Sequence, residues 1–151
     1  MLKFKISLAP KETDAGNVTG FRSERIGFTQ LEELCKHHNY SLITWKVDEK
    51  IKDRRYNRYR KAENFESASG IVLDIDEGID IDDAEKRLRV AGINYAIITS
   101  KSHQKAKNGN PAVDRFHIII PFKKATSARE KYQGAYACLL DVFPEADAST
   151  K

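Results

Sequence analysis

The sequence has little cysteine, proline and glycine. Its 151 residues include two cysteines, four prolines and eight glycines. A collagen-like repeat or a low-complexity, disordered chain would be much richer in proline and glycine, so neither describes this protein. Cys35 and Cys138 lie far apart in helix-like apolar patterns, and we interpret both as small buried residues in a reducing compartment. A hydrophobic core can close at this length without disulfide bonds, so we expect residues 1–151 to form one domain.

A long apolar run is also missing. No run approaches the ~20 residues that a helix needs to cross a bilayer. Residues 1–10 alternate charged and apolar side chains where a signal peptide would have an apolar stretch. These two features predict a cytoplasmic protein with no membrane partner. The net charge is +4, from 26 basic and 22 acidic residues, which permits a polyanionic partner without requiring one.

Hydrophobic periodicity indicates strands separated by helices. Strands are expected at residues 3–9, 40–45, 70–76, 94–100 and 116–121, and helices at residues 29–38, 78–91 and 127–143. A polar loop is expected between the first strand and the first helix. The last two strands are joined by a polar loop, residues 101–114, and are expected to pair as an antiparallel hairpin. The fold class predicted is α+β, with a mostly antiparallel sheet flanked by helices.

Two acidic residues, Asp74 and Asp76, interrupt an apolar strand. Side chains alternate along a strand, so the apolar residues turn inward and both carboxylates share the opposite face, about 7 Å apart. Carboxylates at this spacing repel each other unless a cation lies between them, and Mg²⁺ or Mn²⁺ suits such oxygen ligands. The pattern therefore predicts a divalent-metal site. The acids that follow are interpreted as charges that favour a helix N-terminus: Asp80, Asp82 and Asp83.

A second cluster lies at the start of the last predicted strand. By the same alternation Phe116 faces the core, while Arg115 and His117 face away from it. If this strand shares a sheet with Asp74, the acids and these cationic donors could bind a polyphosphate from two sides. That arrangement suits phosphoryl or nucleotidyl transfer. Further phosphate contacts are predicted from four residues at the end of the preceding strand: Ser100, Lys101, Ser102 and His103.

The segment at residues 50–61 is strongly basic and includes Tyr56 and Tyr59. Arginines interleaved with aromatic residues attract a nucleic-acid backbone and can stack on bases. The arginines expected to bind nucleic acid are Arg54, Arg55, Arg58 and Arg60.

Together these motifs resemble the catalytic domain of archaeo-eukaryotic primases, the primase-polymerase superfamily, and most closely the forms associated with helicases in phages and mobile elements. The family's first motif is an apolar strand bearing Asp-x-Asp, matched by Asp74 and Asp76. Its second motif ends in a histidine at the start of an apolar strand, matched by His117. Its third motif is a later acid, for which Asp147 is the best candidate and Asp141 the alternative. The likeness covers residues 41–151.

The resemblance implies an RRM-like catalytic core and the activity of a DNA primase or polymerase. Such an enzyme transfers nucleotides from ribo- or deoxyribonucleoside triphosphates to a 3′-hydroxyl under the direction of a template, and releases pyrophosphate. Asp74, Asp76 and Asp147 would be catalytic residues that bind two Mg²⁺ or Mn²⁺ ions. The catalytic His117, Arg115 and the turn at residues 100–103 would contact the triphosphate.

The partners implied are nucleoside triphosphates and a primed single-stranded DNA template. The resemblance also allows a helicase domain after Lys151, in a longer primase-helicase of a bacterial or archaeal host cell.

Two other interpretations are kept. Haloacid-dehalogenase-like phosphohydrolases also carry Asp-x-Asp at the end of an apolar strand, but they place a hydroxyl residue where this chain has Gly78, and they form a parallel sheet. A non-catalytic RRM-like nucleic-acid-binding module would present aromatic residues on its open sheet face. Here that face is expected to carry Asp74, Asp76, Arg115 and His117 instead.

Overall fold

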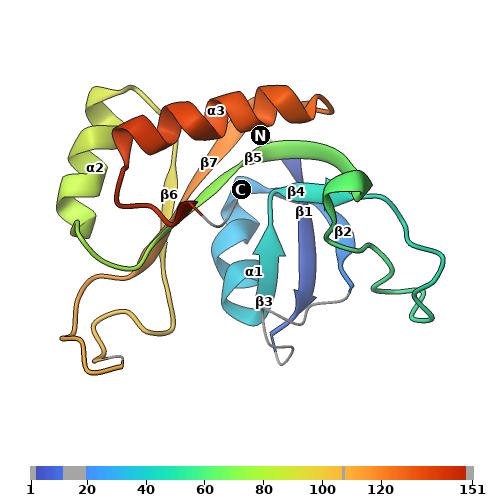
Figure 1. The fold of residues 1–151 in the computed structure, drawn as a ribbon, viewed down its shortest axis with the longest axis horizontal. Coiled ribbons are helices and arrows are strands. Elements are labelled where there is room, and N and C mark those ends of the chain that lie inside the picture. The colour runs from blue at the N-terminus through green and yellow to red at the C-terminus, as the bar shows by residue number, and fades with distance from the viewer. Residues whose placement is uncertain (1–2, 12–19, 107, 149–151) are drawn as a thin grey trace. The chain divides into compact units, whose positions relative to one another are not determined.

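The computed structural model describes residues 3–11, 20–106 and 108–148, with the elements labelled in Figure 1. The strands are β1 (Lys3–Pro10), β2 (Arg22–Gly27), β3 (His38–Ser41), β4 (Ile43–Trp45), β5 (Phe65–Ile75), β6 (Ala96–Thr99) and β7 (Phe116–Thr126). The helices are α1 (Leu31–His37), α2 (Ile81–Val90) and α3 (Arg129–Val142), with single 3₁₀ turns at Phe28–Gln30 and Ala62–Asn64. The fold is α+β with mostly antiparallel sheets, as the sequence predicts. Among the described residues, no helix combines the length and the apolar character needed to cross a bilayer.

The chain divides into two compact units. The first comprises residues 1–70 and 122–129, and the second comprises residues 71–121 and 130–151. β5 and β7 pass from one unit into the other, so each unit contains part of both strands. The expectation that residues 1–151 form one catalytic domain stays a prediction.

In the first unit, β2 is a strand that the sequence pattern misses. β1 pairs antiparallel with both β2 and β3, in the order β2-β1-β3. Residues 22–27 are mostly polar and show no apolar alternation, so the pattern predicts a loop there. Their backbone nevertheless forms a full ladder with β1, from the pair Lys3 and Gly27 to the pair Leu8 and Arg22. The partner strand, which supplies those hydrogen bonds, therefore decides the structure of this segment.

The strand expected at residues 40–45 is two strands. β3 pairs with β1, whereas β4 pairs with the start of β5, where Ile43 lies opposite Ala68. The break is at Leu42, whose side chain is only 1% exposed. Local periodicity cannot show such a change of sheet, because both halves have the extended backbone that the pattern predicts.

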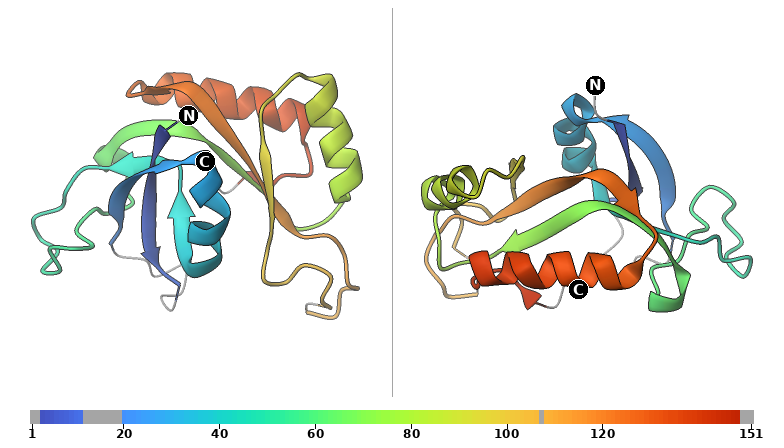
Figure 2. Two further views of the ribbon diagram at one scale, coloured as in Figure 1. Left: turned by 180° about the vertical axis from the view of Figure 1, so that it is seen from behind. Right: turned by 90° about the horizontal axis from the view of Figure 1, so that it is seen from above.

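In the second unit, β7 lies between β5 and β6, in the order β5-β7-β6. The hairpin expected from the sequence is present, because β6 pairs antiparallel with β7 and Ile97 lies opposite Ile118. α2 connects β5 to β6, so the three strands and this helix form a split β-α-β unit. Figure 2 shows the same elements from two further sides, with α2 beside the C-terminal end of α3.

The core of the second unit confirms the predicted alternation along β5. Leu73 and Ile75 are fully buried, as are Ala84 and Leu88 on the inner face of α2. Asp80 is the N-cap residue of α2, and its side chain accepts a hydrogen bond of 2.8 Å from the Asp83 amide.

The two cysteines differ in exposure. Cys35 in α1 is buried, and this burial raises the pKa of its thiol to about 12. Cys138 is exposed on α3, so the expectation that it is buried is wrong. α3 packs through Tyr132 and Tyr136, and a residue two positions after Tyr136 points about 200° away around the helix.

Candidate functional site

Asp74 and His117 meet on neighbouring strands of the second unit. Asp74 Oδ1 lies 3.4 Å from His117 Nε2, which is ion-pair distance when the imidazole is protonated. The two side chains are 33% and 28% exposed, whereas Leu73 and Ile75 beside Asp74 in the strand are fully buried. The apolar residues thus anchor β5 in the core and leave the carboxylate and the imidazole accessible to solvent.

The backbones of Asp147 and Asp74 are hydrogen-bonded to each other. The Asp147 amide donates a hydrogen bond of 2.9 Å to the Asp74 carbonyl oxygen. The Tyr136 hydroxyl donates one of 3.1 Å to the Asp147 carbonyl oxygen. Asp76, just past the end of β5, is exposed. Asp141, the alternative third acid, is exposed within α3, and Asp147 is exposed as well, so exposure does not separate the two candidates. The backbone hydrogen bond to Asp74 is what distinguishes Asp147.

The acidic residues expected to bind two metal ions, all of them among the described residues, do not form a ready ligand cluster. Within residues 3–11, 20–106 and 108–148, no group of three or more His, Cys, Asp or Glu side chains is arranged to hold a metal ion. The Asp74 carboxylate faces His117 instead. The donor types do fit a hard divalent cation, because Asp74 and Asp147, whose backbones are hydrogen-bonded to each other, both carry carboxylates. The two-metal site stays a prediction.

The turn at residues 100–103 lies at the loop end of the β6–β7 hairpin. The Ser100 amide donates to the Arg115 carbonyl oxygen at 2.9 Å, which extends the ladder beyond β6. The Ser100 and Ser102 hydroxyls lie 3.1 Å apart and bond to each other. His103 Nδ1 accepts a hydrogen bond of 3.2 Å from the Arg115 amide. Lys101 is exposed, so its ammonium group is the cation of this turn most open to a phosphate.

Arg115 does not lie on an open face. Its side chain is 3% exposed, so the prediction that it faces away from the core is wrong. The guanidinium donates to the carbonyl oxygens of Ser102 and Lys105, at 3.0 and 2.6 Å. These hydrogen bonds hold the side chain within the loop after β6. The alternation rule considers only the strand itself and does not include such loop contacts. We therefore assign Arg115 to holding this loop and remove it from the proposed triphosphate contacts.

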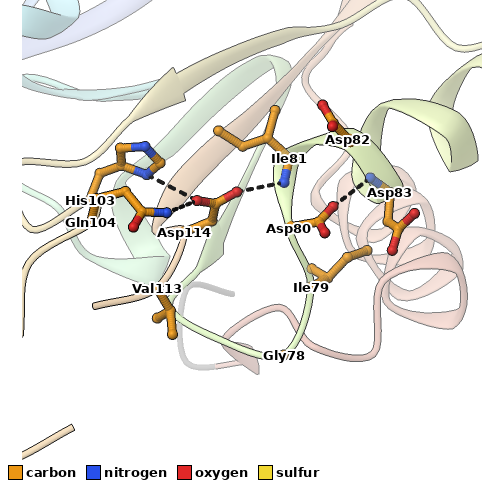
Figure 3. A pocket seen from close by; sticks show the side chains of 10 residues that line it. All are labelled: Gly78, Ile79, Asp80, Ile81, Asp82, Asp83, His103, Gln104, Val113 and Asp114. Carbon is orange, nitrogen blue, oxygen red and sulfur yellow. Dashed lines mark hydrogen bonds and ion pairs between the residues drawn. The ribbon is translucent and has the colours of Figure 1, made fainter. Parts of the chain in front are cut away.

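An open pocket of about 810 Å³ adjoins this turn (Figure 3). Asp114 lines it between Gln104 and Ile81: one carboxylate oxygen accepts a hydrogen bond of 2.9 Å from the Ile81 amide, and the other accepts one from the Gln104 side-chain amide. His103 Nδ1 is 3.9 Å from the same carboxylate. The Ile81 hydrogen bond, helped by Gln104 and opposed by burial, lowers the pKa of Asp114. Asp114 is therefore a second cap for the first turn of α2.

Asp114→Asn is expected to lower the free energy of unfolding at pH 7 by about 1 kcal/mol, since it weakens a hydrogen bond to a charged group. Because the pKa of Asp114 is lowered in the folded state, this stabilisation is present above the ordinary carboxyl pKa of about 4 and is lost as pH falls through the folded value. Urea unfolding at pH 7 and at about pH 3 should show the difference between the two proteins shrinking. The control is Asp82→Asn, which removes a charge from the same helix end. Equal losses in both variants would contradict the assignment.

The basic segment at residues 50–61 belongs to the first unit. Arg54, Arg55 and Arg60 are exposed, as a nucleic-acid contact requires. Arg58 is half-buried instead, and its guanidinium donates to Glu66 Oε2 at 3.1 Å and to the Trp45 carbonyl oxygen. We therefore remove Arg58 from the proposed nucleic-acid contacts.

Basic side chains of the protein itself lie over the two tyrosine rings of this segment. Arg22 and Arg55 lie 5.8 and 5.6 Å from the Tyr56 ring centre, and Lys61 Nζ lies 4.8 Å from that of Tyr59. Cation–π attraction at these distances holds the basic side chains against the rings. A base that stacks on the same ring face would have to replace such a cation.

The sequence pattern missed Arg87 and Glu145. The Arg87 guanidinium donates to both carboxylate oxygens of Glu145, at 3.0 and 2.9 Å. Glu145 lies two residues before Asp147, which could have drawn attention to it, but no local pattern links it to a residue of α2.

Comparisons of the chain with protein-family models, curated proteins and solved structures find no match. Function is therefore inferred from the geometry of Asp74, His117 and Asp147.

Proposed function

We propose that this chain is a metal-dependent nucleotidyltransferase of the primase-polymerase type, which adds nucleotides to a 3′-hydroxyl on a single-stranded DNA template. The observation that carries the proposal is the meeting of Asp74, His117 and Asp147 from three separate segments. His117 Nε2 is 3.4 Å from Asp74 Oδ1, and the Asp147 amide is 2.9 Å from the Asp74 carbonyl oxygen. A carboxylate beside an imidazole on an accessible strand face, with a second acidic residue bonded through its backbone, suits chemistry on a charged phosphate group.

Each side chain has a role in this reaction. Bound divalent ions would supply charge neutralisation at the phosphates and a lower pKa for the attacking hydroxyl. Asp74, Asp76 and Asp147 would hold those ions through carboxylate oxygens. The His117 imidazole, adjacent to Asp74, would donate a hydrogen bond to a phosphate oxygen. The exposed Lys101 ammonium would attract the triphosphate.

The resemblance adds further parts to the proposal. These are a helicase domain as a partner, a bacterial or archaeal host cell and a cytoplasmic location. A haloacid-dehalogenase-like phosphohydrolase is a weaker candidate, because the antiparallel pairing of β6 with β7 differs from the parallel sheet of those enzymes.

The test combines binding with activity. Mn²⁺ binding is followed by the electron paramagnetic resonance signal of the free ion, with and without a nucleoside triphosphate. Extension of a labelled primer is followed in Mg²⁺, in Mn²⁺ and in EDTA. We expect the triphosphate to strengthen Mn²⁺ binding, and extension to require the ion. DNA binding that ignores divalent ions, with no extension, would overturn the proposal in favour of the RRM-like binding module.

A separate prediction concerns the basic segment. Replacing three exposed arginines with glutamine, Arg54, Arg55 and Arg60, should flatten the dependence of DNA binding on salt. Each phosphate contact adds about 0.7 to the slope of log K against log salt for single strands, so the slope should fall by about 2. Fluorescence anisotropy over a salt series measures it.

Arg58→Gln is the matched control for this series. It should leave the slope unchanged and reduce stability, because Arg58 is bonded to Glu66 and Trp45 within the fold. An unchanged slope in the triple variant would dismiss the nucleic-acid role of the segment.

A further inference from the structure

The short segment that follows α3 brings Asp147 to the proposed site. α3 ends at Val142, and Pro144 prevents the helix from continuing. The Phe143 amide donates to Leu139 at 2.8 Å, and the Ala146 amide donates to Phe143 at 3.1 Å. Phe143 is fully buried and Ala146 is 7% exposed. The turn from α3 to Asp147 is therefore anchored in the core.

One side chain of α2 contacts the last residue of α3 and two residues of this segment. Arg87 forms a two-point contact with Glu145, at 3.0 and 2.9 Å, and donates a further hydrogen bond of 3.0 Å to the Val142 carbonyl oxygen. Its guanidinium carbon lies 5.7 Å from the centre of the Phe143 ring. A planar fork bound at two points fixes orientation as well as distance. Glu145 is thus held in one position relative to α2.

Glu145 also lies close to the chain that leaves β5. A Cβ atom at Gly78 would be 3.2 Å from the Glu145 Cγ atom, and Gly78 has a φ of +92°. Both features favour glycine there, so the turn after Asp76 passes close to Glu145.

Asp147 itself is held on both sides. Its amide donates to Asp74, and its carbonyl oxygen accepts from the hydroxyl of Tyr136, a residue that is 2% exposed. A shift of the Glu145 backbone would change both contacts, because only Ala146 separates the two acids.

We propose that Arg87 and Glu145 are positioning residues, which hold the backbone of Asp147 against that of Asp74 and so set the affinity of the site for a divalent cation. The inference rests on the proposed function, because it treats Asp147 as a ligand. Arg87 and Glu145 act through the backbone of Asp147 and through the segment after α3.

The test measures Mn²⁺ affinity by electron paramagnetic resonance, with circular dichroism and thermal unfolding measured on the same samples. Arg87→Lys keeps the positive charge but loses the two-point contact of the guanidinium with Glu145. Glu145→Gln loses the negative charge of the carboxylate. Loss of residues that orient metal ligands typically weakens metal affinity about 10- to 100-fold, and we expect at least the lower value for both variants. The exchanged pair, Arg87→Glu with Glu145→Arg, should recover part of the loss.

Arg89→Lys is the matched control. It is the same substitution on the same helix, but Arg89 pairs with Glu85 within α2, at 2.9 Å. Its Mn²⁺ affinity should equal that of the unchanged protein. Tyr136→Phe removes only the hydroxyl that bonds to Asp147, and it should also weaken Mn²⁺ binding, which keeps the test informative if an Arg87 or Glu145 variant unfolds.

The outcomes separate the two proposals. If the unchanged protein binds Mn²⁺ with a triphosphate, but folded Arg87→Lys, Glu145→Gln and Tyr136→Phe bind it equally well, the positioning role is wrong and the proposed function stands. A lower melting temperature with unchanged Mn²⁺ affinity also overturns the positioning role, since it indicates a purely structural ion pair. If the unchanged protein binds no Mn²⁺, both proposals fail.

Discussion

Asp74→Asn is expected to reduce nucleotide incorporation about a thousandfold or more while the protein stays folded. The substitution keeps the size of the side chain and removes the charge that faces His117 at 3.4 Å. Charge stabilisation by a bound divalent ion contributes several kcal/mol to a transition state, and about 4 kcal/mol corresponds to a factor of a thousand in rate. Single-turnover primer extension in Mn²⁺ measures the loss.

The control for Asp74 is Asp141→Asn. It removes a carboxylate from an exposed position of α3 and should retain extension close to that of the unchanged protein. Extension by Asp147→Asn should fall as it does in Asp74→Asn, because both carboxylates are proposed to hold the divalent ions. Near-normal extension by Asp74→Asn would refute the assignment of this site. A loss in Asp141→Asn without a loss in Asp147→Asn would identify Asp141 as the third acid.

Arg115→Met is expected to lower the free energy of unfolding by about 2–3 kcal/mol. Methionine can occupy the buried space, but it offers no donor to the carbonyl oxygens of Ser102 and Lys105. A carbonyl group left without its partner costs about 1–3 kcal/mol when it stays away from water. Urea unfolding monitored by circular dichroism measures the change.

Lys101→Met is the matched control for Arg115. Lys101 is an exposed cation in the same loop, and its substitution should change stability by no more than about 0.5 kcal/mol. Triphosphate affinity separates the two interpretations of Arg115. A large loss of affinity in Arg115→Met with unchanged stability would restore the sequence-based prediction that Arg115 contacts the triphosphate.

The sequence pattern predicted much of the second unit. Leu73 and Ile75 face the core and Asp74 does not, because side chains alternate along any strand. α2 and the β6–β7 hairpin also follow the expected periodicity and spacing. The motifs then indicated that Asp74 and His117 belong together, although a sequence by itself does not show which strands are neighbours.

Other features could not be predicted from local patterns. β2 forms because β1 supplies its hydrogen bonds, and residues 40–45 divide between two sheets. Arg115 is buried because loop carbonyl oxygens accept hydrogen bonds from its guanidinium. In each case a partner distant along the chain determines the conformation.

Periodicity thus accounts for the face on which most polar groups of β5 and α2 lie, since this depends on backbone geometry within one element. It accounts for the open carboxylate of Asp74 and for the apolar residues that anchor β5. The tertiary structure decided which polar groups meet. The contacts of Asp147 with Asp74, and of Arg87 with Glu145, join segments far apart in the chain, and their donors and acceptors find each other only when those segments pack.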